Sequence, residues 1–322
     1  MRNNCSDSRR IIAIAGMALA LLVFFGIITY NVTMGREVLA LPGGGSFLST
    51  STPTPTPVPC TKPRHAGGDS SVAIISGGVK RTFLLHLPPD YGQHLQPLVV
   101  GYHGYSWTSQ FMENVTRLNV TADHNGFILA MPQGVDSPPS WNAGNGPYGP
   151  TADANDVQFS RDLLAHLTKN YCVDAHRVYL TGFSLGGGMV YRVACALSEQ
   201  ITAIATVSGA YYPFGGCHPA RPLPVLEIHG AVDTEAPYDG SQAMHIASVH
   251  DYLSVWRSLD KCSSASHVIM QTNNITGTAW SQCASDTEVV HYRIANGDHH
   301  WPGEQTMDTN ATIWEFFSNY SR

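Results

Sequence analysis

Short apolar segments alternate with amphipathic ones along most of the chain after about residue 70. Residues 71–76 and 80–88 predict two strands joined at Gly77 and Gly78. Six further apolar runs end in glycine or turn residues, which is typical of strands buried on both faces. These runs cover residues 97–104, 126–134, 177–184, 201–209, 222–230 and 288–297.

Stretches with helical character lie between these runs. They cover residues 156–171, 185–200, 243–262 and 306–320. A repeated order of strand and helix implies a mainly parallel sheet with helices on both faces. We find no internal repeat and no second linker, so we predict one α/β domain over residues 61–322. In such sheets ligands bind beyond the carboxyl ends of the strands, so a site is expected there.

The first 60 residues differ from this pattern. Residues 11–30 form an uncharged apolar run, long enough as a helix to span a hydrocarbon core of ~30 Å. Arg9 and Arg10 precede the run, so the positive-inside rule keeps residues 1–10 in the cytoplasm and exports the chain beyond the run. We expect an uncleaved signal anchor, the chain's only membrane contact, with secretion after signal-peptide cleavage as the alternative. Residues 31–60 are rich in Gly, Ser, Thr and Pro and predict an extended linker.

Composition narrows the class of protein. Hydrophobic residues make up 43% of the chain and charged residues 13%, which allows a sizeable core. The formal net charge is −6, and no cluster of Lys or Arg occurs after the first ten residues, which argues against a nucleic-acid partner. Six cysteines lie beyond the apolar run. An even number in an exported segment suggests disulfides, and the absence of a Cys-x-x-Cys motif argues against a zinc site.

A candidate nucleophile lies where one predicted strand meets a helix. Residues 182–186 read Gly-Phe-Ser-Leu-Gly, the G-x-S-x-G pattern of a strained turn between strand and helix. The glycines are needed because a side chain two residues from the serine would meet the neighbouring strand or helix. The turn exposes the hydroxyl of Ser184, and the backbone N–H of Leu185 becomes a natural oxyanion donor. A glycine-rich turn with an incidental serine is the structural alternative.

A serine nucleophile needs a base and a carboxylate that orients the base. In this type of fold the chain order is serine, acid, histidine. Asp233 lies just after the predicted strand at 222–230 and is the first candidate for the acid, although it could merely cap a turn. Glu235 and Asp239 lie nearby and are rival candidates.

Two adjacent histidines compete for the role of base. His299 and His300 lie after the last predicted strand and after the candidate acid. Neighbouring residues in an extended loop point in opposite directions, so at most one of them reaches the serine oxygen. A metal cluster with Asp298 is disfavoured because no further ligand occurs at helical spacing. Spacing alone leaves the choice between the two histidines open.

The sequence resembles the extracellular esterases grouped as polyhydroxybutyrate depolymerases and feruloyl or acetylxylan esterases, within the α/β-hydrolase superfamily. The matching stretches cover nearly the whole exported domain and are PLVVGYHG, SWNAGN, NDVQFSRDLL, YCVDAHRVYLTGFSLGGGMVYRVAC, PLPVLEIHGAVDTEAPYDG and NGDHHWPG. The last stretch is similar to the family pattern Gly-x-His-x-Trp-Pro-Gly, in which the base is the histidine two residues before the tryptophan. The resemblance therefore implies that His299 is the base and that His300 occupies a variable position.

The resemblance also implies a second oxyanion donor near the first His-Gly pair. There the backbone N–H of Gly104 or Tyr105 would join that of Leu185. His103 and His229 precede glycine at two strand ends, and we interpret both as structural residues.

Aromatic residues near these motifs are expected to form the wall of an acyl or sugar pocket, with simple loop packing as the alternative for each of them. They are Tyr105, Trp107, Trp141, Tyr148 and Trp301. The family's habit of linking a cysteine before the last strands to one within them implies a Cys262–Cys283 disulfide. A second pair, Cys195–Cys217, is also expected.

These assignments imply a serine esterase of α/β-hydrolase fold that works through an acyl-enzyme without metal or organic cofactor. The implied substrates are polymeric or oligomeric: feruloyl or acetyl esters of xylan, or short hydroxyalkanoate polyesters. A serine peptidase of the same fold and a catalytically inactive, tethered polysaccharide-binding protein remain alternatives. The sequence leaves the oligomeric state open.

Overall fold

The computed structural model describes residues 58–150 and 154–322. Its strands are β1 (Gly68–Ser76), β2 (Val79–Leu87), β3 (Gln96–Tyr102), β4 (Ile128–Pro132), β5 (Val173–Phe183), β6 (Ala203–Val207), β7 (Val225–Gly230), β8 (His267–Gln271), β9 (Ile275–Trp280) and β10 (Val289–Ile294). Its helices are α1 (Ser109–Thr116), α2 (Leu118–Asn125), α3 (Asp156–Asn170), α4 (Leu185–Leu197), α5 (Val249–Leu259) and α6 (Thr309–Ser318), with a short 3₁₀ turn at Ala284–Asp286.

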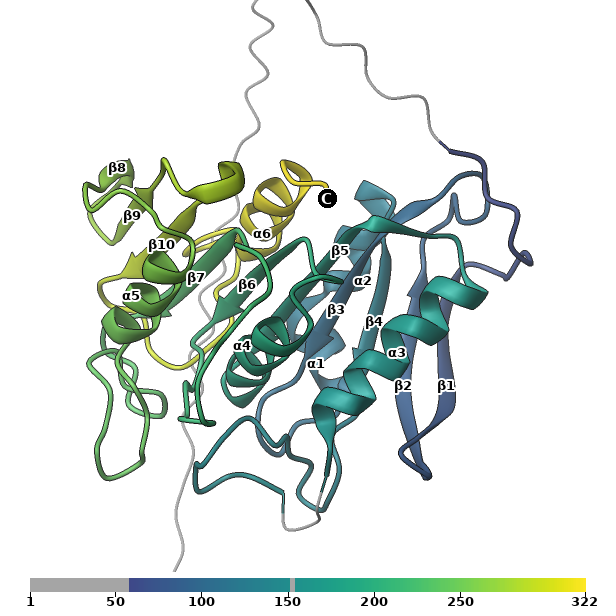
Figure 1. Cartoon of the computed structure of the whole chain (residues 1–322), viewed down its shortest axis with the longest axis horizontal. Coiled ribbons are helices and arrows are strands. Elements are labelled where there is room, and N and C mark those ends of the chain that lie inside the picture. Colours follow the sequence, from purple (N-terminus) through teal and green to yellow (C-terminus); the bar gives the residue numbers. More distant parts are fainter. Residues whose placement is uncertain (1–57, 151–153) are drawn as a thin grey trace, which may run out of the picture. The chain divides into compact units, whose positions relative to one another are not determined.

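The strands join into one sheet in the order β1-β2-β4-β3-β5-β6-β7-β10-β9-β8 (Figure 1). Neighbouring strands from β4 through β10 in this order run parallel. Antiparallel strands extend the sheet at both edges, with β2 and β1 at one edge and β9 and β8 at the other. The predicted mainly parallel sheet is confirmed, and its parallel part brings the carboxyl ends of six strands to one edge.

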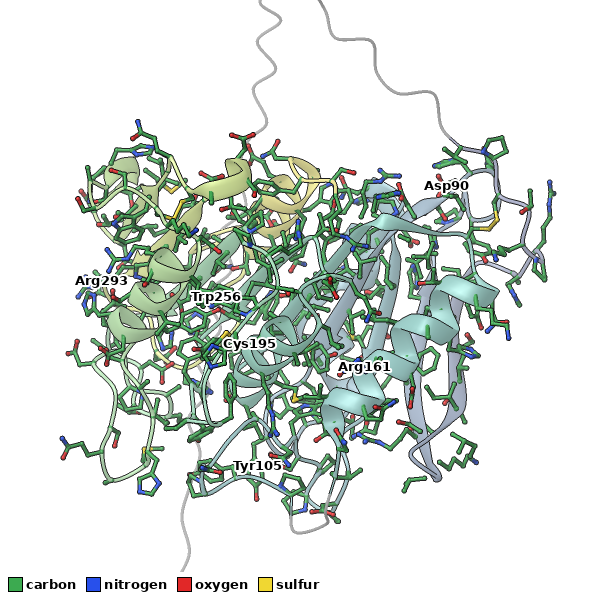
Figure 2. The ribbon with its side chains drawn as sticks, in the orientation of Figure 1. Asp90, Tyr105, Arg161, Cys195, Trp256 and Arg293 are labelled. Carbon is green, nitrogen blue, oxygen red and sulfur yellow. A yellow bond between two sulfur atoms is a disulfide. The ribbon has the colours of Figure 1, made fainter. Side chains whose placement is uncertain are left out.

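Helices cover both faces of the sheet and bury a separate apolar layer on each. Helices α3, α4 and α5 lie over one face, and α1, α2 and α6 lie over the other (Figure 1). Figure 2 shows Cys195 on α4 and Trp256 on α5 over the first face. Strand β5 serves both layers, because Val178 and Leu180 belong to one cluster and Tyr179 to the other. Alternate residues of a strand point to opposite faces, which explains why these strands are apolar throughout.

Several element boundaries differ from the prediction. The helix expected over 243–262 is confined to α5, because the preceding residues form turns and a short bridge between Ser241 and Ile246. Helices α1 and α2 and the edge strands β8 and β9 were not predicted. Every residue of β8 is exposed, and its apolar run covers only Val268–Met270, which is shorter than the runs of about four to eight residues that are typical of buried strands.

The six cysteines of the described chain form three disulfides. Both expected pairs are present, Cys195–Cys217 and Cys262–Cys283. The third pair, Cys60–Cys172, ties the start of the domain to the residue before β5 across a separation of 112 residues. Disulfides of this kind are typical of exported proteins.

The expected cytoplasmic tail (1–10), signal anchor (11–30) and most of the linker (31–60) lie outside the described residues. Within the described ranges, none of the helices is long and apolar enough to cross a membrane.

Candidate active site

Ser184 occupies the turn between the end of β5 and the first residue of α4. Its backbone has φ 56° and ψ −123°, a conformation that a non-glycine residue adopts only where the surrounding structure enforces it. A Cβ atom at Gly186 would lie 2.0 Å from the carbonyl oxygen of Tyr102, and one at Gly182 would lie 2.4 Å from the carbonyl oxygen of Gly186. Both glycines are therefore required by close approach of the backbone, as the sequence pattern predicted.

Asp233 lies just after β7, and its side chain is fully buried. Its Oδ1 accepts hydrogen bonds from the backbone N–H groups of Glu235 and Ala236, at 2.9 and 2.8 Å. Its Oδ2 lies 2.8 Å from Nδ1 of His299. Burial alone would raise the pKa of the Asp233 carboxyl, but hydrogen bonds from His229 and His299 hold it well below its usual range. Asp233 is therefore an ionised acceptor aimed at the histidine.

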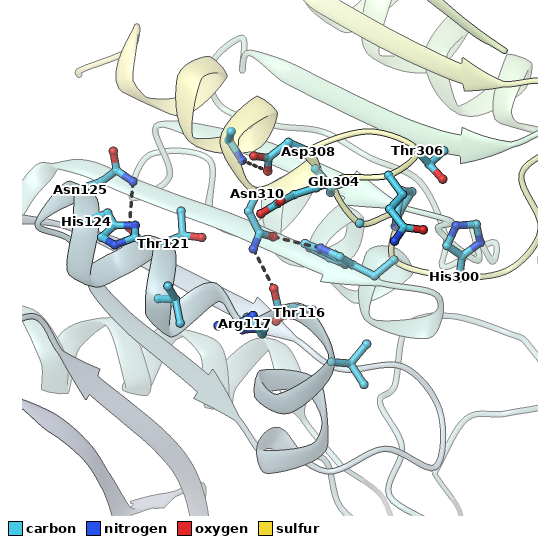
Figure 3. Close-up of a pocket in the computed structure, with 18 residues that line it drawn as sticks. Thr116, Arg117, Thr121, His124, Asn125, His300, Glu304, Thr306, Asp308 and Asn310 are labelled. Atoms are coloured by element: carbon cyan, nitrogen blue, oxygen red, sulfur yellow. Dashed lines mark hydrogen bonds between the residues drawn. The ribbon is translucent and has the colours of Figure 1, made fainter. Parts of the chain in front are cut away.

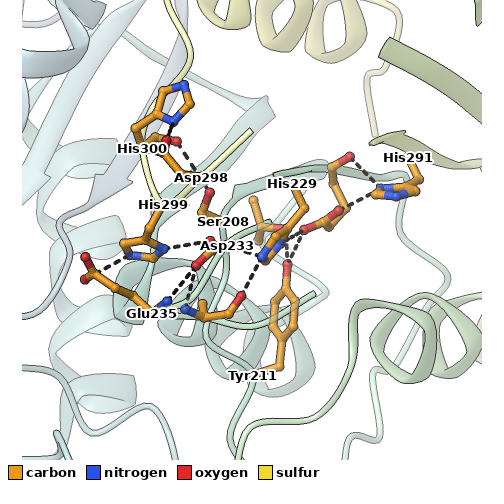
Figure 4. A network of polar contacts seen from close by, with 12 residues as sticks. Ser208, Tyr211, His229, Asp233, Glu235, His291, Asp298, His299 and His300 are labelled. Carbon is orange, nitrogen blue, oxygen red and sulfur yellow. Dashed lines mark hydrogen bonds and ion pairs between the residues drawn. The ribbon is translucent and has the colours of Figure 1, made fainter. Parts of the chain in front are cut away.

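His299 and His300 face different partners, as Figure 4 shows. The Nδ1 atom of His299 contacts Asp233, and its ring packs against Phe183 with centroids 4.8 Å apart. His300 instead turns toward the exposed Asp298. Of the two histidines, only His299 contacts the candidate acid, which is the choice that the family pattern implied.

The rival acids are placed differently. Glu235 is 75% exposed, and its carboxylate lies 3.9 Å from Nε2 of His299, the nitrogen away from Asp233. Asp239 is exposed. Within the described chain no hydrogen bond joins Ser184 to His299. Such bonds are often long in unliganded hydrolases and tighten when substrate binds.

The turn after β3 lies directly against the serine. A Cβ atom at Gly104 would lie 3.3 Å from Cβ of Ser184. The amides of Ser106 and Trp107 are already bonded to carbonyl groups, so the amides of Gly104 and Tyr105 are the candidate donors of this turn. The N–H of Leu185 opens helix α4, where the first amides lack an acceptor inside the helix.

His103 holds this turn in place. It is fully buried, and its Nε2 accepts a hydrogen bond from the backbone N–H of Gly134 at 2.9 Å. Nδ1 then carries the proton and donates it to the carbonyl of Gly104 at 2.8 Å. Burial lowers the pKa of His103 to about 4, so the ring is neutral. These contacts agree with the structural role expected for this histidine.

Ser184 and His299 line one cavity of 480 Å³ together with Gly104, Tyr105 and Leu185. Its further wall includes Trp107, Tyr148, Tyr212 and Met244. The rings of Tyr105 and Tyr148 lie 4.8 Å apart. Figure 2 shows Tyr105 among the loops beyond the edge of the sheet. The cavity thus has several aromatic side chains in its wall beside the serine. Tyr212 and Met244 were missed because they lie outside the sequence motifs.

Two of the tryptophans expected in the pocket lie elsewhere. Trp141 is fully buried, and its indole N–H donates to the carbonyl of His103, so it supports the turn from behind. Trp301 is buried as well, and its N–H donates to Asn310. It borders a separate open depression of 720 Å³ (Figure 3). That depression is larger than the cavity but includes neither Ser184 nor His299, so its size does not make it the site.

One group of side chains in the described chain has the spacing of metal ligands. Asp69, His86 and Glu113 offer ligand atoms within 4.8 Å of one another. Both ring nitrogens of His86 already face carboxylates, those of Asp69 and Asp123, at 2.6 and 2.8 Å. None of these residues lines the cavity at Ser184.

Comparison with known proteins identifies the family of the chain. The family model described as esterase PHB depolymerase matches residues 81–268, more than half of the chain. The chain belongs to this esterase family. The match begins in β2 and ends in β8, so it contains the serine turn and the candidate acid, while His299 lies beyond it.

Individual relatives of this family member are also esterases by name. Feruloyl esterase B of Piromyces equi is 27% identical over 256 residues, covering 75% of this chain and 45% of the relative. A bifunctional acetylxylan esterase/xylanase of Neocallimastix patriciarum is 24% identical over 249 residues, covering 76% of this chain and 34% of the relative. The chain thus spans less than half the length of each of these two relatives.

A solved structure, the acetyl xylan esterase from Aspergillus awamori, superposes with a TM-score of 0.57 at 14% identity. The superposition covers 77% of this chain and 99% of that one. At this level of identity the likeness shows the fold alone. The fold of this family member is therefore that of the α/β-hydrolases.

Proposed function

We propose that the protein is an extracellular serine esterase that hydrolyses carboxylic esters carried by polymers or oligomers. One observation carries the proposal: His299, which is hydrogen-bonded to Asp233, lines the same cavity as Ser184, which lies on a strained turn. The family to which the chain belongs is one of ester hydrolases, which supports the same reaction class.

In the proposed mechanism His299 takes the proton of the Ser184 hydroxyl as its oxygen attacks the ester carbonyl. Asp233 orients the ring and stabilises its charged form. Amides of Leu185 and of Gly104 or Tyr105 stabilise the oxyanion of the tetrahedral intermediate. His299 then gives the proton to the departing alcohol, and water activated by the same histidine releases the acid from the acyl-serine.

The aromatic lining of the cavity suits both an aromatic acyl group and a sugar. Tyr105, Tyr148 and Trp107 line the cavity beside Ser184, and aromatic side chains pack well against a feruloyl ring or a sugar plane. The relatives named as feruloyl and acetylxylan esterases support xylan esters as the substrate class. Short hydroxyalkanoate polyesters are the second substrate class, supported by the family match.

The proposed location outside the cell rests on two features. Three disulfides tie the described domain, which is typical of oxidising compartments. The apolar run at 11–30 supplies a segment for export in the sequence, either as an anchor or as a cleaved signal.

The test is hydrolysis of methyl ferulate, acetylated xylan and hydroxybutyrate oligomers by the purified chain. Ser184→Ala is expected to lower kcat by roughly 10⁴-fold or more. Ser106→Ala is the matched control, because Ser106 lines the same cavity but lies outside the proposed triad. A fluorophosphonate should add one covalent label to Ser184. Full activity of folded Ser184→Ala, or labelling elsewhere, would refute the mechanism.

A further inference from the structure

A row of buried titratable groups continues behind the candidate acid. Glu227 and His229 lie on β7, and His291 lies on β10 opposite Glu227 in the strand register. All three residues are at least 95% buried. Figure 4 shows His291, His229 and Asp233 in one row that leads to His299. The row joins the interior of the sheet to the active site.

The hydrogen-bond partners of His229 define its protonation. Its Nδ1 lies 2.8 Å from Oε1 of Glu227. Its Nε2 lies 2.8 Å from the carbonyl oxygen of Ala236 and 3.3 Å from Oδ2 of Asp233. A carbonyl and ionised carboxylates only accept hydrogen bonds, so both nitrogens must carry a proton. With Glu227 ionised, this geometry places an imidazolium cation directly behind Asp233.

The electrostatics of the two strand residues agree with this assignment. Burial would lower the pKa of His229, but Glu227, Asp233 and the carbonyl of Ala236 outweigh it and raise the pKa to about 10. Burial would raise the pKa of Glu227, but His229 and His291 outweigh it and hold the pKa below its usual range. At neutral pH the pair is thus charged on both sides.

Other titratable and charged groups face the row from each neighbouring element. The hydroxyl of Tyr211 donates to Glu227 at 3.1 Å, and the hydroxyl of Tyr238 pairs with Nε2 of His291 at 2.8 Å. The remaining groups around the row are Tyr252 stacked on Tyr211, His250 and Arg293 against the Tyr238 ring, Asp239 near Tyr238, and Glu235 beside His299. None of these side chains contacts the carboxylate of Asp233, whereas Nε2 of His229 lies 3.3 Å from its Oδ2.

We propose that His229 is a positioning residue that stays charged through the reaction, anchored by Glu227, and that its charge sets the lower pH limit of activity. The inference rests on the proposed function, because it assigns His299 as the base. His229 touches neither the cavity nor the serine, so it acts through Asp233.

The balance of charge explains the effect. With His299 neutral, Glu227, Asp233 and His229 together carry one excess negative charge, which a proton on His299 neutralises. Without the cation on His229, the buried Glu227 loses a partner that keeps it ionised and is expected to take up a proton, while Asp233 keeps its negative charge and faces His299 with no opposing cation behind it, so the acid limb of activity is expected at higher pH. His229 and His299 both contact Oδ2 of Asp233, at 3.3 and 2.8 Å. At this separation the change is expected to be about one to two pH units.

The first experiment measures kcat/KM against pH for wild type, His229→Gln and Tyr211→Phe. The acid limb of His229→Gln is expected to move to higher pH by about one to two units. Tyr211→Phe is the matched control: it removes a neutral donor to Glu227 and changes no charge, so its limb should stay in place. The proposal would be overturned if His229→Gln folds but the midpoint of its acid limb lies within about 0.3 pH units of wild type, or at lower pH.

The second experiment needs neither activity nor the His229 variant. ¹⁵N and ¹H NMR of the histidine rings should show both nitrogens of His229 protonated up to about pH 9 in wild type. In Glu227→Gln the same ring should lose its proton at least one pH unit lower. A neutral His229 ring in wild type at pH 7 would overturn the proposal even if a variant failed to fold. If Ser184→Ala retained activity while His229 was found charged, the proposed function would fail and the buried cation would stand.

Discussion

Replacing Gly104 by alanine tests whether the turn after β3 supplies the oxyanion hole. The new methyl group would lie 3.3 Å from Cβ of Ser184 and 3.2 Å from a ring carbon of Phe183. Carbon atoms in favourable contact lie about 3.5–4.0 Å apart, so the turn must withdraw by a few tenths of an ångström. The amides of Gly104 and Tyr105 would move with it.

The expected effect falls on catalysis more than on stability. Oxyanion donors act at about 2.7–3.1 Å, and losing one donor completely costs about 10²–10³ in kcat. A withdrawal of a few tenths of an ångström removes part of that bond, so we expect kcat to fall about 10- to 100-fold. KM should change little, because the ground-state carbonyl depends less on this contact. Overpacking of this size should cost about 1–3 kcal/mol of unfolding free energy.

Initial rates with methyl ferulate and thermal unfolding of the same samples would separate the two effects. Gly303→Ala is the matched control, since a Cβ at Gly303 has no neighbour within 4 Å. Suppose that folded Gly104→Ala keeps kcat within twofold of wild type. Displacement of the turn would then leave catalysis unaffected, and the amides of Gly104 and Tyr105 would not be the oxyanion donors.

Three further predictions concern other parts of the domain. Asp233→Asn should lower kcat by about 10³–10⁴, because an amide N–H would face the protonated Nδ1 of His299; a loss under tenfold would contradict the assigned acid. Replacing both Cys60 and Cys172 by serine should cost about 5 kcal/mol in urea unfolding, more than removing either short disulfide, because the closed loop spans 112 residues; an equal cost would contradict the loop-entropy argument. Burial raises the pKa of Asp260 to about 7, so its carboxyl binds a proton on folding between about pH 4 and 7. The unfolding free energy of wild type relative to Asp260→Asn should therefore fall, by up to about 1.4 kcal/mol per pH unit, as pH rises through this window, and a constant difference would contradict the shift.

The sequence predicted that Ser184, Asp233 and His299 lie at one edge of the sheet because its signals there are local. The glycines around Ser184 are demanded by backbone contacts within the same turn, so the pentapeptide carries its own geometry. The candidate acid and base come after apolar runs that are central parallel strands, and parallel strands end at one edge. The parallel arrangement of the strands brings these residues together, and the apolar pattern of the sequence predicts that arrangement.

The sequence did not predict whether the side chain of a loop residue points into the core or into the cavity. Trp141 and Trp301 lie close to the motifs, but both turn inward and donate to buried acceptors. Tyr212 was not singled out, yet it lines the cavity. An aromatic residue in a loop packs inward or outward according to the tertiary neighbours that satisfy it, and these are not encoded locally.

The same limit applied to the row behind the acid. Glu227 and His229 are two residues apart on one strand, so the sequence places them on one face of the sheet. Their connection to His291 depends on the register between β7 and β10, which lie about 60 residues apart in the chain. Their connection to Asp233 depends on how the loop after β7 folds back. The sequence therefore indicated only a structural residue at His229, and its contact with the acid was missed.

Stability alone gives no reason for an ion pair inside β7. Every residue of this strand is buried, and replacing a buried ion pair by apolar side chains of similar volume is often neutral or stabilising. Apolar side chains at these positions could not donate a hydrogen bond to Asp233, whose Oδ2 would then have His299 as its only side-chain partner. The charges in β7 are better explained by the orientation and ionisation of the acid than by the strength of the core. Strand β7 would then have two roles at the site. It leads into the loop that carries Asp233, and it holds the charged His229 that contacts Asp233.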